Sequence, residues 1–183
     1  MEQIDVTMTP ESPLYANLIT VKELVYDNCG FEFTNLKLNS ESVEYGACSF
    51  ELNGHTVEHR VSKITPAKAG QFVTIWKRNK NGVTAPFDFS DNIDFVVITS
   101  KSGDNIGQFI FPKLGLADKG IISQNGKDGK RGIRVYPPWD TVTNSQAETT
   151  KNWQTKYFVT IKSKNHAVLD RTRKLFNKDG TDF

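Results

Sequence analysis

The chain has 183 residues, of which 37% are hydrophobic, and a formal net charge of +2. A chain of this size can bury one full core, and its composition excludes an intrinsically disordered protein. No stretch of about 18 apolar residues occurs, which excludes a transmembrane helix. The first residues also lack the apolar core of a signal peptide. We therefore expect a cytoplasmic protein with no membrane partner.

Residues 11–29 are predicted to be the first helix. Pro13 suits the first turn of a helix, where its missing N–H costs nothing. Apolar side chains then recur at intervals of four and three, which places them on one helical face: Leu14, Leu18, Val21 and Val25.

From residue 44 onward, short apolar runs separated by turn residues are typical of strands. Asn53-Gly54 at the centre of ACSFELNGHTVEHRVSKIT predicts a hairpin, because both residues accept positive φ. Further strands are expected in GQFVTIWKR, IDFVVITS, IGQFIFPK, GIRVYP and FVTI. IDFVVITS is nearly all apolar at its centre and should be a buried central strand. Helical turns are expected in LGLADKG, and a helix over residues 144–157 after a capping box at Thr143 to Gln146.

These elements predict a single domain over residues 1–161. Its fold class is α/β or α+β, with a mixed, mostly antiparallel sheet flanked by helices. Residues 162–183 are polar and basic, and we expect them to form a loosely ordered tail.

Positive charge gathers in two regions although the net charge is small. No acid occurs from His59 to Phe87, and the stretch GKDGKRGIRVYPPWD joins a glycine-containing loop, taken to be flexible, to a short strand. Clustered cations can contact phosphates, and an aromatic ring beside them can stack on a base. We therefore predict a nucleic-acid-binding surface; solvated cations and core aromatics are the alternative. The predicted contacts are Arg60, Lys63, Lys68, Lys77, Arg78, Lys127, Lys130, Arg131, Arg134 and Tyr136.

A metal-dependent nuclease would need carboxylates that converge on Mg²⁺. The candidates are Glu44, Glu58, Asp88, Asp91 and Asp94, with solvated turn acids as the alternative. The three histidines, His55, His59 and His166, form neither a metal-binding pattern nor part of a catalytic triad. Cys29 and Cys48 have no metal-binding spacing; we expect reduced thiols, with a single disulfide left open. No metal or other cofactor is therefore expected, unless the protein is a nuclease.

Four stretches together resemble the MepB-like family over about residues 44–158: AKAGQFVTIWKR, GQFIFPK, NGKDGKRGIRVYPPWD and NSQAETTKNWQTKYF. The family comprises small cytoplasmic bacterial proteins and takes its name from a protein encoded beside a multidrug efflux pump. The resemblance implies a domain similar to restriction endonucleases, with a mixed sheet between helices, and it suggests nucleic-acid binding.

The nuclease superfamily places an acid on one strand and (D/E)xK on the next. Carried over to this sequence, the resemblance implies Asp94 as the acid, Gln108 in the second acidic position and Ile110 where the lysine is expected, with Lys113 three residues further on. The leading hypothesis is nucleic-acid binding without catalysis, to DNA or RNA, in an unknown oligomeric state. A divergent Mg²⁺-dependent nuclease, and a protein-interaction or ligand-binding module in a drug-response pathway, are the alternatives.

Overall fold

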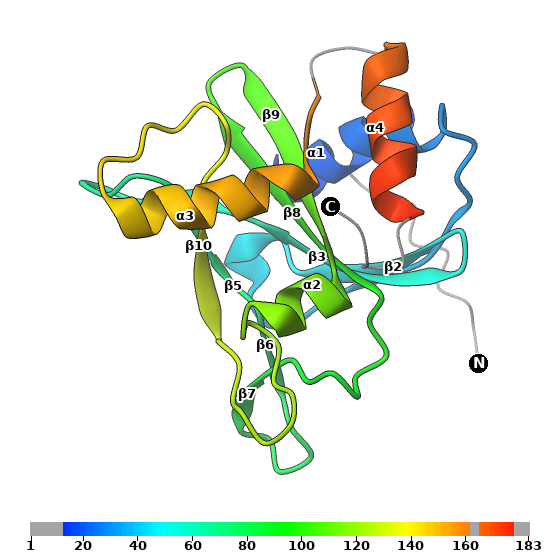
Figure 1. Cartoon of the computed structure of the whole chain (residues 1–183). Coiled ribbons are helices and arrows are strands. Elements are labelled where there is room, and N and C mark those ends of the chain that lie inside the picture. Colours follow the sequence, from blue (N-terminus) through cyan, green and yellow to red (C-terminus); the bar gives the residue numbers. More distant parts are fainter. Residues whose placement is uncertain (1–12, 162–164, 178–183) are drawn as a thin grey trace.

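A six-stranded sheet forms the centre of the computed structural model, which describes residues 13–161 and 165–177 (Figure 1). In spatial order its strands are β1 (Phe33–Leu38), β2 (Cys48–Leu52), β3 (His55–Val61), β8 (Phe95–Ser102), β9 (Asn105–Pro112) and β11 (Phe158–Thr160). Strands β3 and β8 pair in parallel, and the other neighbours pair antiparallel. The mixed, mostly antiparallel sheet flanked by helices agrees with the prediction.

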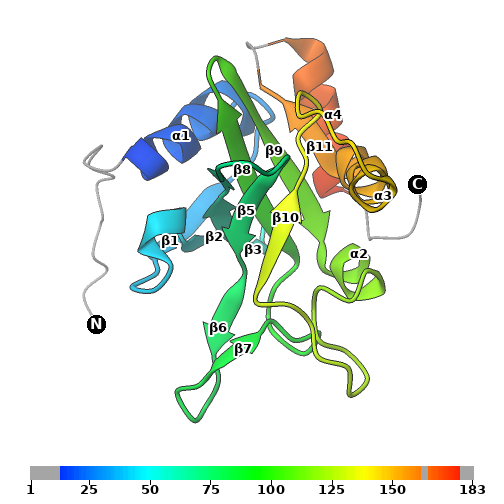
Figure 2. The same cartoon turned by 90° about the vertical axis from the view of Figure 1, so that its left-hand side faces the viewer.

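Two smaller sheets accompany the large one. Strands β10 (Gly132–Val135), β5 (Gln71–Thr74) and β4 (Lys63–Ile64) form a three-stranded sheet, and β6 (Trp76–Arg78) pairs with β7 (Thr84–Pro86). Figure 2 shows β5 and β10 side by side in front of the larger sheet. The single strand predicted over GQFVTIWKR is therefore two strands, which separate at Ile75 and join different sheets.

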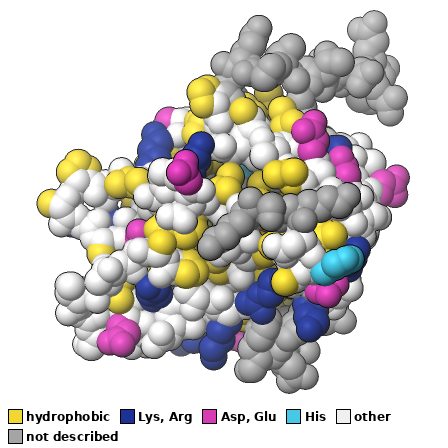
Figure 3. Space-filling model, turned by 90° about the horizontal axis from the view of Figure 1, so that it is seen from above, with side chains coloured by type: hydrophobic (Ala, Val, Ile, Leu, Met, Phe, Trp, Pro, Cys, Tyr) yellow, Lys and Arg dark blue, Asp and Glu magenta, His cyan; other side chains and the backbone are white. Residues whose placement is uncertain are grey.

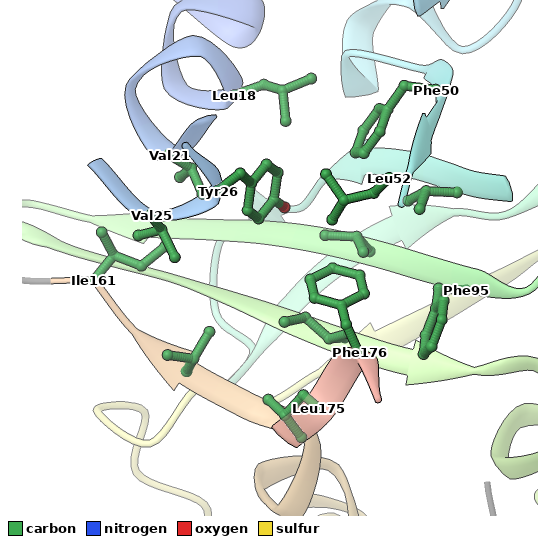
Figure 4. Packing of buried hydrophobic residues seen from close by; sticks show 14 of the residues in the cluster. Leu18, Val21, Val25, Tyr26, Phe50, Leu52, Phe95, Ile161, Leu175 and Phe176 are labelled. Atoms are coloured by element: carbon green, nitrogen blue, oxygen red, sulfur yellow. The ribbon is translucent and has the colours of Figure 1, made fainter. Parts of the chain in front are cut away.

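Both faces of the large sheet are covered, as the alternation along β8 shows. Phe95 and Val97 point into one core, whereas Val96 and Ile98 point into the other. The first core packs under α1 (Pro13–Val21), a π-helical turn η1 (Lys22–Tyr26) and α4 (His166–Phe176) (Figure 4). The second core packs under the three-stranded sheet, α2 (Lys113–Asp118) and α3 (Ser145–Gln154). The prediction of a buried central strand is confirmed.

Several local predictions are also confirmed. The hairpin turn between β2 and β3 has φ of 49° at Asn53 and 78° at Gly54, as its residue types require. Leu18, Val21 and Val25 of the predicted stripe are buried in the first core. Both cysteines are free thiols. Within residues 13–161 and 165–177, every helix is too short or too polar to cross a bilayer.

Other local features differ from the sequence-based expectations. Strand β1 is not among the expected strands; all of its residues are half-buried or exposed, so no buried alternation marks it in the sequence. The helix α3 begins one residue later than predicted, because the side chain of Asn144 accepts the capping hydrogen bond from the backbone N–H of Ala147. Two short 3₁₀ turns, η2 (Val43–Tyr45) and η3 (Thr155–Tyr157), were not expected.

The predicted loosely ordered tail is wrong for residues 166–176, which form α4. Its apolar side chains lie on one face, and the buried ones include Leu175 and Phe176 of the first core. Asn165 caps the helix by accepting from the backbone N–H of Val168 at 2.9 Å. The segment is polar on average, but its apolar residues recur with the period of a helix. Such an apolar face allows the helix to pack against the core. Positions 162–164 and 178–183 of the predicted tail lie outside the described residues.

Candidate nucleic-acid interface

An open pocket of about 480 Å³ lies between β10 and α3. Strand β10 forms one wall, with Tyr136 just beyond its end, and α3 forms the other with Ala147, Thr150 and Trp153. Among the strands of residues 13–161 and 165–177, β10 pairs with β5 alone, so its second edge faces the helix. Figures 1 and 2 show α3 lying against β10 from two directions.

The side chain of Gln154 joins the two walls. Its amide N–H donates to the backbone oxygen of Arg134 at 2.9 Å, and its carbonyl oxygen accepts from the backbone N–H of Tyr136, also at 2.9 Å. Gln154 is buried, so both halves of the amide are satisfied by the edge of β10. This double hydrogen bond fixes the spacing between strand and helix, and with it the width of the pocket.

Three cations line the pocket, namely Lys119, Lys130 and Arg134. The Lys119 ammonium lies 5.6 Å from the ring centroid of Trp153. No carboxylate of the described residues pairs with Lys119 or Lys130, and none appears among the described lining residues. The pocket therefore presents positive charge and aromatic surface without a neutralising acid.

Arg134 and Tyr136 also hold the segment that connects β4 to β5. The guanidinium of Arg134 donates to the backbone oxygen of Ala69 at 3.0 Å and to Oγ1 of Thr65 at 2.8 Å. The Tyr136 ring lies so close to Gly70 that a Cβ there would stand 2.7 Å from ring atoms, and Gly70 has φ of +76°. Arg134 is consequently a structural residue as well as a cation at the pocket.

The glycine-containing loop before β10 is held in place rather than free. The backbone N–H of Lys130 donates to the oxygen of Ile121 at 2.9 Å, and that of Gly129 donates to Oγ of Ser123 at 2.8 Å. A Cβ on Gly129 would overlap the Ile121 carbonyl, so glycine is required for this close approach. The expectation of a flexible loop is thus wrong for its second half, and the backbone of Lys130 is held beside the pocket.

The other predicted cations do not join the pocket. Lys127 and Lys68 are exposed, and Arg131 donates to the backbone oxygen of Thr84 at 3.1 Å, away from the lining. The Lys63 ammonium lies 4.5 Å from the Tyr45 ring centroid.

Two more of the predicted cations form ion pairs with acids. Lys77 pairs with Asp91 at 2.5 Å, and Arg78 pairs with Glu41. In the view from above (Figure 3), Lys and Arg side chains are interspersed with acidic and hydrophobic ones rather than gathered in a strip.

Arg60 was predicted to contact nucleic acid at the surface, and this is wrong, because its side chain is only 1% exposed. It lies on β3, which has β2 on one side and β8 on the other, under the second core. Its Nη1 donates to Glu58 Oε2 at 3.2 Å, while Nε and Nη2 have no partner among the described residues. Burial raises the pKa of Glu58, and the neighbouring Arg60 opposes that rise.

Two of the three catalytic candidates are neighbours, since the backbone N–H of Lys113 donates to the backbone oxygen of Asp94 at 2.9 Å, but Gln108 lies apart from them. Gln108 is fully buried and bonds to Tyr26 and Thr99 on the side of the first core. The Asp94 carboxylate accepts from the backbone N–H of Thr56 at 2.8 Å, and the Lys113 ammonium donates to the backbone oxygen of Asp91 at 3.1 Å. Within the described ranges, no three His, Cys, Asp or Glu side chains gather into a group that could hold a metal ion.

Sequence reasoning found Lys130, Arg134 and Tyr136 but missed Lys119 and Trp153. A signal was present for the helix wall. Ala147, Thr150, Trp153 and Gln154 recur at spacings of three, three and one, which places them on one helical face. No local pattern marks Lys119, which reaches the pocket only because α2 ends beside α3.

By its fold, this protein is a mixed α/β domain built on a mostly antiparallel sheet. A model of the MepB-like family matches residues 39–160, and the chain belongs to that family. A crystal structure of MepB is 32% identical, with a TM-score of 0.69 over 80% of this chain and 97% of that chain. The resemblance seen in the sequence is confirmed.

A second solved structure, the bacterial homing endonuclease I-Ssp6803I, is 13% identical with a TM-score of 0.43, over 90% of this chain and 95% of that chain. A search of curated proteins found no match.

Proposed function

We propose that this protein binds nucleic acid through the pocket between β10 and α3. The observation that carries the proposal is the lining itself, in which three cations and two aromatic rings meet without a carboxylate among the described residues. Lysine and arginine bind phosphates through charge, and each phosphate contact releases counterions. Aromatic rings bind bases by stacking, with little dependence on sequence.

Ion pairing in the structure supports some of the predicted contacts more than others. Lys119 and Lys130 have ammonium groups that no described acid neutralises, whereas Lys77 and Arg78 are already paired. A paired cation gains less from a phosphate, because its carboxylate partner must first be displaced. Binding energy should therefore depend on the pocket lysines more than on other surface lysines.

The test is a titration of labelled DNA and RNA, single- and double-stranded, monitored by fluorescence anisotropy at low and moderate salt. The double variant Lys119→Ala plus Lys130→Ala should weaken binding at least about tenfold and reduce the slope of log Kd against log salt by about 1–2. The matched control is Lys80→Ala plus Lys127→Ala. It removes the same charge from exposed positions outside the lining and should change Kd much less.

Two results would contradict the proposal. Absence of binding at micromolar protein in low salt would remove nucleic acid as the ligand. Equal losses for the pocket pair and the control pair would show that binding follows overall charge and does not use the pocket. All variants should keep the thermal midpoint of the parent, since exposed substitutions usually change stability by less than about 0.5 kcal/mol.

A further inference from the structure

The dimensions of the pocket bear on which form of nucleic acid it can accept. Its volume of about 480 Å³ falls within the range of about 300–1,000 Å³ that is usual for sites that enclose a small ligand. A duplex keeps its bases stacked inside and exposes only their edges and its backbone, so it cannot place a whole base in such a pocket. A base can enter only if it is unpaired or turned out of the stack.

Aromatic side chains occur on both walls of the pocket. Trp153 is the ninth residue of α3 and its ring lies beside the Lys119 ammonium, whereas the Tyr136 ring lies on the strand side against Gly70. The two rings come from opposite walls, and both are half-buried. Partly buried rings lose little side-chain freedom on stacking, which favours their use as a platform for a base.

Polar groups that are not engaged elsewhere complete the helix wall. Asn144 uses its side-chain oxygen to cap α3, but its amide nitrogen has no partner in the described part of the chain. Gln146 and Thr150 likewise make no side-chain hydrogen bond there. Amide and hydroxyl groups are the ones that read the edges of unpaired bases. Gln154, by contrast, is fully used by β10.

The lysines supply the part of the site that suits a phosphate. The backbone of Lys130 is held by its hydrogen bond to Ile121, which leaves the exposed ammonium able to reach a ligand, and the Lys119 ammonium is exposed beside the Trp153 ring. In a nucleotide the phosphate and the base are covalently linked. A phosphate bound by these ammonium groups would therefore bring its base toward the aromatic rings. Aromatic surface, unengaged amides and cations therefore line the same pocket.

We propose that the pocket receives a single unpaired nucleotide, with its base against Trp153 and Tyr136 and its phosphate on Lys119 and Lys130. This inference rests on the proposed function and makes it specific. The protein then prefers single strands to duplexes, and a free mononucleotide occupies the same site. Nothing in this assignment requires cleavage of the strand.

The experiment compares two fluorescein-labelled probes of the same sequence, a single strand of about 12 nucleotides and the blunt duplex. The intact protein should bind the single strand at least about tenfold more tightly. A mixture of nucleoside monophosphates should displace the strand, whereas adenosine, which lacks the phosphate, and sodium phosphate, which lacks the base, should not. Gln146→Ala should weaken strand binding and leave the duplex affinity unchanged.

Trp153 also contacts Phe111 of the second core, so its removal can disturb the fold. Thr150→Trp gives an independent variant, because it fills the pocket from the helix wall without removing a core contact. It should abolish displacement by mononucleotides and reduce single-strand binding at least about tenfold. Trp76→Leu, at a half-buried tryptophan outside the lining, should leave both unchanged.

The outcomes separate this inference from the proposed function. Equal affinity for single strand and duplex, with no displacement by mononucleotides, overturns the inference while nucleic-acid binding still stands. Displacement by sodium phosphate as effective as by mononucleotides shows an anion site that ignores the base, and also overturns it. If neither probe binds at all, the proposed function fails, and the inference fails with it.

Discussion

The side-chain carbonyl oxygen of Gln154 accepts a hydrogen bond of 2.9 Å from the backbone N–H of Tyr136. A side chain from the last turn of α3 thus replaces a neighbouring strand at the free edge of β10. Together with the bond from Gln154 to the Arg134 carbonyl, it is the polar connection between the two pocket walls. Backbone groups at a covered strand edge need such partners, because a lost hydrogen bond there is not regained from water.

Gln154→Leu should lower the free energy of unfolding by about 1–3 kcal/mol, because it leaves the Tyr136 N–H and the Arg134 carbonyl without their partner. The measurement is urea unfolding followed by tryptophan fluorescence. Gln146→Leu, on the exposed part of the same helix, is the control and should shift stability by less than about 0.5 kcal/mol. Equal effects of the two changes would mean that the Gln154 bonds contribute nothing specific.

Phe176→Ala should destabilise the domain by about 3–5 kcal/mol, the usual cost of removing a buried aromatic ring. Phe176 is 4% exposed and packs edge-on against Phe95, with 5.1 Å between ring centroids, and against Phe31 at 5.7 Å. Lys174→Ala on the exposed side of α4 serves as the control. A small effect of Phe176→Ala on the thermal midpoint would indicate that α4 is detached in solution.

His59 should make stability fall in acid. Its ring is fully buried between Thr99 and Cys48, and burial lowers the pKa of His59 from 6.5 to about 3. The unfolded chain takes up a proton below about pH 6.5, whereas the folded chain does not until about pH 3. The stabilising contribution is complete above pH 6.5 and is lost progressively as the pH falls towards 3.

The measurement is the free energy of unfolding of wild type and His59→Gln between pH 7 and the acid limit of folding. The wild-type curve should fall more steeply, with a difference in slope of at most about 1.4 kcal/mol per pH unit. Parallel curves would show that His59 is protonated in the folded protein. Taking the difference between the two proteins cancels the shared titration of the carboxylates.

No cleavage of supercoiled plasmid or single-stranded DNA is expected with Mg²⁺ or Mn²⁺. Gln108 is closed inside the first core, and the Asp94 carboxylate already accepts from the Thr56 backbone, so the three candidates offer no common metal site. The assay uses purified protein and Asp94→Ala side by side. Cleavage that disappears in Asp94→Ala would contradict the prediction and establish a nuclease.

The fold was most predictable where local chemistry determines it. Asn53-Gly54 requires positive φ whatever surrounds it, and the apolar run from Phe95 to Ile98 can be satisfied only between two cores. Helix α4 was missed because the average polarity of its segment hid a periodic apolar face.

The site was only partly predictable, because it depends on which segments meet. Lys130 and Tyr136 were identified from their own stretch of sequence, but Lys119 and Trp153 belong to the pocket only through packing. Arg60 shows the opposite limit. Its charge predicted a position at the surface. The residues next to it in the sequence do not indicate that β3 lies between β2 and β8, where the Arg60 side chain is buried.

The parallel pairing of β3 with β8 has a consequence for the order in which the chain folds. Residues 57–61 pair with residues 95–99, and the segment between them forms β4 to β7 rather than the usual crossover helix. Such non-local contacts raise contact order and slow folding, because the long loop must close before its contacts are made. The three-stranded sheet takes β4 and β5 from inside this crossover and β10 from beyond it. We therefore expect the pocket wall to be completed late in folding, so that ligand binding would report on fully folded molecules rather than on partly folded ones.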